Sequence, residues 1–145
     1  MPKQIINPPN MPKPKGFSHA VKVGNTIYLA GIVGVDENWK VVGDIAAQVD
    51  RAYENMRRVL EAAGARMTDV VKMTHYCRDI DELITAGGVR PKYFGDYRPA
   101  DTMVQVSRLA MPELRVEVEA VAASAPSQRQ AHCRGQPTVN LNHLA

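Results

Sequence analysis

Residues 44–64 read DIAAQVDRAYENMRRVLEAAG and predict the longest helix of the chain. Asp44 is suited to cap its first turn, because a carboxylate there accepts hydrogen bonds from the early helix N–H groups. Gly64 is suited to end it, because glycine tolerates a left-handed backbone. The apolar side chains between them fall at helical spacing on one face: Ile45, Val49, Ala52, Met56, Val59, Leu60 and Ala63. We therefore expect an amphipathic helix that packs on a core.

Runs rich in β-branched and aromatic residues on both sides of this helix predict a sheet. Gly24 and Asn25 suit the two-residue turn of a hairpin between the first two strands. The expected strands are residues 18–23, 26–33, 40–42, 69–77, 102–107 and 115–122.

A second helix is expected to run from Asp79 or Asp81 toward Phe94. Gly87-Gly88 and Pro91 should break it, because glycine and proline destabilise a helix interior. One mixed sheet with two helices on one face is an α+β fold. The other face must then be buried by something outside the chain, most simply by further copies of it.

The 145 residues are 45% apolar, which fits one globular domain and excludes intrinsic disorder. Residues 1–15 hold five of the ten prolines and predict an extended arm with no ladder of its own. Residues 125–145 lack periodicity and predict a loosely ordered tail after a body at 16–124. The net charge of +3 lies in these two ends, because the body holds 13 basic and 15 acidic residues. A net-negative body argues against nucleic acid as a partner.

The chain has no run of about 18 apolar residues and no apolar signal region, so we expect a cytoplasmic protein without a membrane partner. Cys77 lies in a strand-like run and Cys133 in the tail. Two thiols at unrelated sites form neither a disulfide framework nor a zinc motif, and we expect both to be reduced.

Three runs of the body occur in an order that resembles the RidA family, also called YjgF or L-PSP ribonuclease-like. They are GFSHAVKVGNTIYLAGIVGVD (16–36), LEAAGARMTDVVKMTHYCRDIDEL (60–83) and YRPADTMVQVSRLAMPELRVEVEAVA (97–122). The resemblance spans about Gly16 to Ala123. It implies a chorismate-mutase-like protomer that assembles as a homotrimer with clefts between subunits. It also implies hydrolysis of small enamines or imines such as 2-aminoacrylate, without a metal or cofactor.

The resemblance implies that an arginine of a Pro-Ala-Arg motif binds the substrate carboxylate as a bidentate pair. In this chain the motif is Pro99-Ala100-Asp101, so an acid stands at that position. Asp101 would repel a carboxylate by about 1 kcal/mol in water and by several times that in a drier cleft. We therefore expect a substrate that presents an amine or a hydroxyl to Asp101.

Other family positions are also changed in this chain. By the resemblance, a family tyrosine corresponds to Phe17, a serine to Ala30 before Gly31, and an asparagine to about Gly87. The last-strand acid that acts on a water corresponds to Glu119. The expected catalytic residues are Glu119 and Asp101, and the expected substrate contacts are Phe17, Ala30, Gly31, Met103 and Arg98.

Several of these acidic and basic residues also have ordinary structural interpretations. Asp101 could cap its strand or pair with Arg98, and Glu119 could lie with Arg115 and Glu117 on a polar strand face. Arg90 or Arg98 could replace the missing arginine, although arginines near a helix end are more often solvated.

The histidines allow similar alternatives. His19 could transfer a proton near the cleft, but an ordinary strand histidine is the commoner case. His75 and Cys77 share a strand face, as two metal ligands could, but the sequence offers no third and fourth donor. We therefore expect core packing there and no metal.

These observations predict a divergent Rid-type hydrolase or deaminase that acts on a small enamine, imine or related nitrogenous metabolite. The alternative is a non-catalytic trimer that binds a metabolite or protects a partner protein, since four polar positions are lost together. Ribonuclease activity is the least expected function, because phosphate contacts need cations and the body is net negative.

Overall fold

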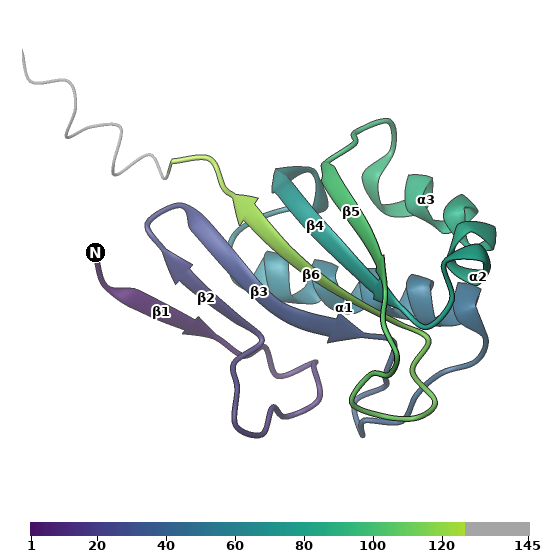
Figure 1. The fold of residues 1–145 in the computed structure, drawn as a ribbon. Helices are drawn as coiled ribbons and strands as arrows, with labels where there is room; N and C mark the ends of the chain where they lie inside the picture. Colours follow the sequence, from purple (N-terminus) through teal and green to yellow (C-terminus); the bar gives the residue numbers. More distant parts are fainter. Residues whose placement is uncertain (127–145) are drawn as a thin grey trace, which may run out of the picture.

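Helix α1 (Ile45–Ala62) packs along one face of the sheet (Figure 1), as its amphipathic pattern predicts. The Asp44 carboxylate accepts a hydrogen bond from the Ala47 N–H at 3.0 Å and so caps the first turn. Gly64 follows the helix with φ of 80°, in the left-handed region. The structure describes residues 1–126, and the tail predicted at 125–145 lies almost wholly outside them.

The six strands form one mixed sheet in the order β1-β2-β3-β6-β4-β5. Only β4 and β5 run parallel, and every other neighbouring pair is antiparallel. The strands are β1 (Lys3–Ile6), β2 (Ala20–Val23), β3 (Thr26–Val33), β4 (Val70–Cys77), β5 (Ala100–Gln105) and β6 (Val116–Ala123). The α+β prediction is confirmed.

The predicted hairpin is present between β2 and β3. Val23 pairs with Thr26, so Gly24 and Asn25 form the two-residue turn. Gly24 has a φ of 59°, which a residue with a Cβ rarely adopts.

The expectation that the N-terminal arm pairs with no strand is wrong for β1. Lys3 lies opposite Val23 and Ile6 lies opposite Ala20, which makes β1 the antiparallel edge of the sheet. The physical reason is that the prolines flank residues 3–6 without interrupting them, so their N–H groups remain free to pair.

The strand predicted at 40–42 is also wrong, because this segment contributes only an isolated bridge between Val35 and Val41. The Asp36 carboxylate accepts hydrogen bonds from the N–H groups of Asn38 and Lys40, which folds the segment into a tight turn. Trp39 inside this turn has a φ of 64°.

The predicted second helix is broken where glycine and proline predict it. It consists of α2 (Ile80–Thr85), the 3₁₀ turn η2 (Gly87–Val89) and α3 (Arg90–Phe94); a further turn, η1 (Met67–Asp69), precedes β4. Asp79 caps α2 by accepting the Glu82 N–H at 3.0 Å. Pro91 stands in the first turn of α3, where its missing N–H costs nothing.

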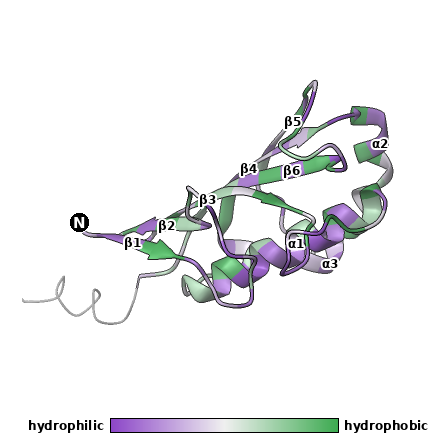
Figure 2. Cartoon of the chain, turned by 90° about the horizontal axis from the view of Figure 1, so that it is seen from below, coloured by the Kyte–Doolittle hydropathy of each residue, from purple (hydrophilic) through white to green (hydrophobic). Residues whose placement is uncertain are grey.

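The two faces of the sheet differ. Figure 2 shows α1 and α3 on the same side, and the core between helices and sheet includes the fully buried Met56, Leu60 and Met73. Within residues 1–126 no helix covers the opposite face, and Tyr28 on that face is 53% exposed. None of the helices in this part of the chain has the length and hydropathy needed to cross a membrane.

Gly34→Ala should destabilise the fold, because α1 and the sheet meet there backbone to backbone. A Cβ at Gly34 would lie 2.6 Å from the carbonyl oxygen of Gln48 and 2.7 Å from its Cα. We expect a loss of about 1–3 kcal/mol in the free energy of unfolding, measured by urea denaturation.

Gly88→Ala is the matched control, because nothing lies within 4 Å of a Cβ at that position. We expect its free energy of unfolding to stay within about 0.5 kcal/mol of the wild type. Equal stability of the two variants would contradict the close approach at Gly34.

Candidate functional site

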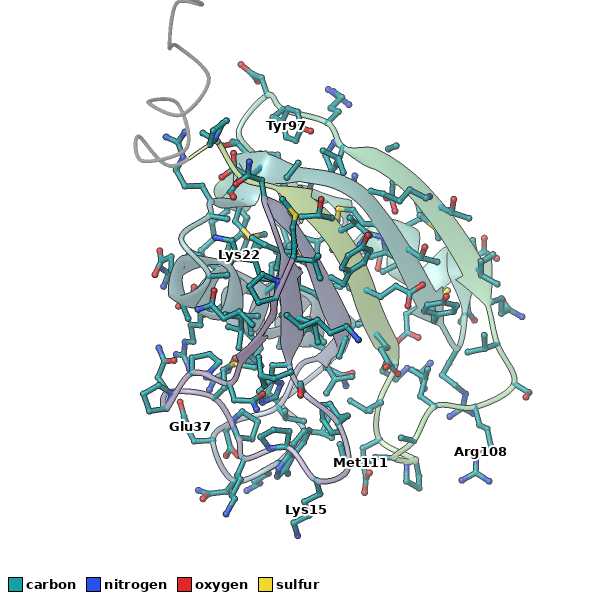
Figure 3. The ribbon with its side chains drawn as sticks, turned by 90° about the vertical axis from the view of Figure 1, so that its left-hand side faces the viewer. Lys15, Lys22, Glu37, Tyr97, Arg108 and Met111 are labelled. Atoms are coloured by element: carbon teal, nitrogen blue, oxygen red, sulfur yellow. The ribbon has the colours of Figure 1, made fainter. Side chains whose placement is uncertain are left out.

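The first hollow of interest has a volume of about 350 Å³ and is lined by Phe17, Trp39, Met111 and Glu117, among others. We call it the Glu117 hollow. Figures 1 and 3 show that the loop before β2, which carries Lys15, and the β5–β6 loop, which carries Met111, lie at the same end of the molecule. The Phe17 and Trp39 rings meet at 6.1 Å between centroids and 69° between planes. The hollow is therefore largely aromatic and apolar, with one carboxylate.

Gly31 makes room for that carboxylate. A Cβ at Gly31 would lie 1.8 Å from Oε1 of Glu117, so any larger residue at position 31 would require the Glu117 carboxylate to move. The register of β3 against β6 shifts between Leu29 and Ile32, and such irregularities often re-aim side chains next to active sites. Burial raises the pKa of Glu117, and the nearby charge of Glu119 raises it further.

Glu119 lies elsewhere on the exposed face of the sheet. The Tyr76 hydroxyl donates to its Oε1 at 2.7 Å. Glu119 lines a second hollow of about 210 Å³ with Tyr28 and Lys72, and none of the predicted substrate contacts lines it. Within one chain, the acid that lines the hollow with Phe17, Ala30 and Gly31 is therefore Glu117.

A third hollow, of about 240 Å³, lies between β5 and the α2–α3 segment. Its lining includes Tyr53, His75, Gly87, Arg90 and Met103, and we call it the Arg90 hollow. The predicted contact Met103 lies here, whereas Phe17 and Gly31 lie in the Glu117 hollow. Within one chain, the predicted site residues that line a hollow are therefore divided among three separate ones.

A hydrogen-bonded chain of four side chains runs along the Arg90 hollow. Asp101 pairs through Oδ1 with Nδ1 of His75 at 2.8 Å and through Oδ2 with Nη2 of Arg90 at 2.5 Å. The Tyr53 hydroxyl lies 2.8 Å from Nε2 of His75. Burial raises the pKa of Tyr53 to about 12, so its hydroxyl keeps its proton.

Both oxygens of Asp101 are therefore paired within the chain. Burial disfavours its charged form, yet the hydrogen bonds from His75 and Arg90 prevail and hold its pKa below the usual value of 3.8. Its partner is Arg90, whereas Arg98, the alternative partner, is exposed and lines none of these three hollows. The charge of Asp101 is thus balanced in part by Arg90 within the chain.

The remaining candidates have structural partners. His19 is 2% exposed, and its Nε2 hydrogen-bonds the Pro12 carbonyl at 2.7 Å. Its ring stacks on Trp39 with 6.3 Å between centroids, so it supports the lining of the Glu117 hollow. Cys77 is a buried free thiol, and among residues 1–126 no three His, Cys, Asp or Glu side chains could hold a metal together. Arg115 binds Glu82 and not Glu119.

Sequence reasoning missed Glu117, Trp39 and Tyr53 as members of these hollows. One signal for Glu117 was available, because alternation along a strand puts Glu117 and Glu119 on one face. That alternation cannot say which of the two acids meets Gly31.

Residues 9–124 match the family model described as Endoribonuclease L-PSP. The chain is 43% identical over 125 residues to a RutC family protein of Pyrococcus abyssi, a match that covers 84% of this chain and 98% of the relative. It is 39% identical over 123 residues to the 2-iminobutanoate/2-iminopropanoate deaminase of Dermatophagoides farinae. This match covers 83% of this chain and 95% of the relative.

The chain is also similar in fold to solved structures. RidA from the Antarctic bacterium Psychrobacter sp. PAMC 21119 has a TM-score of 0.79 at 32% identity, over 83% of this chain and 99% of the other. E. coli TdcF with bound serine has a TM-score of 0.78 at 26% identity, over 84% and 99%.

Gly31→Ala should push the Glu117 carboxylate out of its place, because the added Cβ would overlap Oε1. We expect the pKa of Glu117 to fall toward its usual 4.5, since the carboxylate gains solvent. An NMR titration of the Glu117 side chain measures this, with Gly88→Ala as the control. An unchanged raised pKa in Gly31→Ala would refute the packing of Glu117 against Gly31.

Asp101→Asn should destabilise the protein at pH 7 and have less effect in acid. The pKa of Asp101 is lowered in the folded chain, so its ionised form stabilises the fold above about pH 3.8. This contribution is lost as the pH falls through the folded pKa. Urea denaturation of both proteins from pH 7 to pH 3 should show the difference shrinking, and a constant difference would contradict the paired Asp101.

Proposed function

The chain belongs to the endoribonuclease L-PSP family, the RidA (YjgF) family that its sequence resembles, and on this premise we propose that it is a deaminase of small 2-imino acids and their enamine tautomers. The observation that carries the proposal is the Glu117 carboxylate, held in a largely apolar hollow with a raised pKa. A relative 39% identical over most of both chains has the name 2-iminobutanoate/2-iminopropanoate deaminase, which supports this substrate class.

The chemistry needs one water and a group that moves protons. Water adds to the imine carbon, the carbinolamine collapses, and ammonia leaves a 2-oxo acid behind. Glu117 takes one proton from the attacking water and passes it to the imine nitrogen, and then moves the hydroxyl proton of the carbinolamine to the departing nitrogen, so both water protons leave in ammonia. A raised pKa suits both steps, because general acid–base catalysis is most effective when the pKa lies near the working pH, and it contributes roughly 10²- to 10⁴-fold.

The surroundings of Glu117 suit a small substrate with an apolar end. Phe17, Trp39 and Met111 offer apolar surface to an alkyl group and keep bulk water from the imine. Ala30 and Gly31 bring β3 close without adding a polar side chain. Asp101 has both carboxylate oxygens paired, so in this proposal it contacts Arg90 and His75 and not the substrate.

The complete site lies between subunits in this proposal. The exposed sheet face and the separation of the site residues into different hollows both favour a closed oligomer, and the family resemblance favours a homotrimer. A neighbour would cover the face that carries Tyr28 and Glu119. This proposal requires the Glu117 hollow of one chain to meet the Arg90 hollow of the next.

A second candidate is a non-catalytic metabolite-binding protein. The observation that favours it is the apolar lining of the Glu117 hollow, with Phe17 and Ala30 at positions where the family resemblance implies hydroxyl groups. Stabilisation by a stable metabolite, without turnover of any imine, would favour this candidate. Nuclease chemistry has less support, because Lys72 and Arg90 are the only cations among the residues that line these three hollows.

Glu117→Gln should abolish most of the deaminase activity, because the amide cannot accept the proton of the attacking water. We expect the rate of imine hydrolysis above the uncatalysed rate to fall by about 100-fold or more. The assay follows imine loss and ammonia release from 2-imino acids generated in situ from 2-amino acids by an amino acid oxidase.

Glu113→Gln is the control for a lost surface charge, because Glu113 is exposed and lines none of the three hollows. Glu119→Gln tests the acid that the sequence favoured. A large loss of deaminase activity in Glu119→Gln, with little loss in Glu117→Gln, would assign the proton transfer to Glu119. A wild type with no activity would overturn the deaminase proposal.

A further inference from the structure

We propose that Arg90 binds the carboxylate of the substrate and that Asp101 holds the guanidinium in position for it, an inference that rests on the proposed function. The reason is that the substrate and Asp101 are both negatively charged. A 2-imino acid is an anion, and a buried or partly buried anion needs a directional donor. Asp101 is itself an acid, so the donor must come from another residue.

Arg90 is the cation of the Arg90 hollow. Its side chain is 30% exposed, so the guanidinium is neither buried in the core nor fully solvated. A guanidinium carries five N–H donors, and the hydrogen bond to Asp101 uses one of them. Donors therefore remain to face the hollow beside Met103 and Gly87. Gly87 has no side chain, and nothing lies within 4 Å of the place a Cβ would take, so the approach to the hollow is open.

The orientation of Arg90 is fixed by three residues in series. Asp101 accepts from Nη2 of Arg90 at 2.5 Å and also binds Nδ1 of His75 at 2.8 Å. A carboxylate only accepts, so Nδ1 of His75 carries the proton of that bond. Tyr53 contacts the other ring nitrogen at 2.8 Å, and His75 is 1% exposed. A guanidinium held in this way loses less entropy when it binds a second carboxylate.

The other nearby cations fit this role less well. Lys72 donates to the Thr102 hydroxyl at 2.7 Å on the exposed face of the sheet, away from Met103. Arg115 is bound to Glu82 through both Nε and Nη2. Arg98 lines none of the three hollows.

The first test measures the binding of 2-oxobutanoate, a stable carboxylate with the backbone of the expected product. Its uncharged methyl ester is the comparison ligand. By titration calorimetry we expect the wild type to bind the acid at least about tenfold more tightly than the ester. Arg90→Met should weaken binding of the acid by about 10- to 100-fold and leave the ester nearly unchanged.

Two further variants keep this test decisive. Arg90→Lys retains the charge without the planar fork, and we expect it to recover only part of the lost affinity. Lys92→Ala removes a positive charge from the same helix, but Lys92 pairs with Asp50, so binding should stay within about twofold of the wild type. Equal affinity of Arg90→Met and the wild type for the acid would overturn the proposal, as would a wild type that does not prefer the acid.

The positioning role of Asp101 has a separate readout. Asp101→Asn keeps an oxygen for Arg90, and the His75 ring can change tautomer to match the amide. Asp101→Leu keeps the size without an acceptor. We expect Asp101→Asn to bind 2-oxobutanoate within about threefold of the wild type and Asp101→Leu to lose about tenfold. Equal losses of affinity in Asp101→Asn and Asp101→Leu would overturn the positioning role of Asp101.

The imine assay separates this inference from the proposed function. Binding of 2-oxobutanoate through Arg90 without any imine hydrolysis would overturn the deaminase proposal and support the carboxylate site at Arg90. Imine hydrolysis by Arg90→Met at the wild-type rate and with unchanged KM would support the deaminase proposal and overturn the carboxylate site at Arg90. A raised KM with a smaller change in kcat is the result we expect.

Discussion

Strand β6 pairs with β3 on one side and with β4 on the other, and these two ladders position the strand residues of the site. The β3 ladder brings Gly31 against Glu117 through a shift in register. The β4 ladder fixes His75 in the core, and β4 in turn holds β5, which carries Asp101 and Met103. The parallel pairing of β5 needs the long crossover through α2, η2 and α3, and that crossover delivers Arg90.

Two acids of this chain are placed in opposite electrostatic settings. Burial, with a second acid nearby, raises the pKa of Glu117, whereas donors from His75 and Arg90 lower the pKa of Asp101. Such a division suits one acid for proton transfer and the other for holding a cation. The same fold thus accommodates an aspartate where the family resemblance implies an arginine, because an arginine eleven residues earlier is paired to it.

The local features could be predicted from the sequence, and the non-local ones could not. The Asp44 cap, the Gly24-Asn25 turn and the break at Gly87 follow from preferences within a few residues. Strand β1 was missed because its stability comes from β2, some 17 residues away in the chain. Glu117 and Glu119 share a strand face, and only the register of β3 decides which of them meets Gly31. The Arg90–Asp101 pair depends on a crossover whose path no short pattern encodes.

Trp39 illustrates how such a site constrains the variation of a sequence. Its left-handed φ costs about 1–2 kcal/mol relative to an ordinary backbone, and the Asp36 turn holds it there. A glycine would relieve that strain, but it would remove the indole that stacks on His19, donates to the Lys13 carbonyl at 3.0 Å and lines the Glu117 hollow. Trp39 therefore serves the fold and the lining of the hollow with one side chain, so a substitution at this position changes both at once.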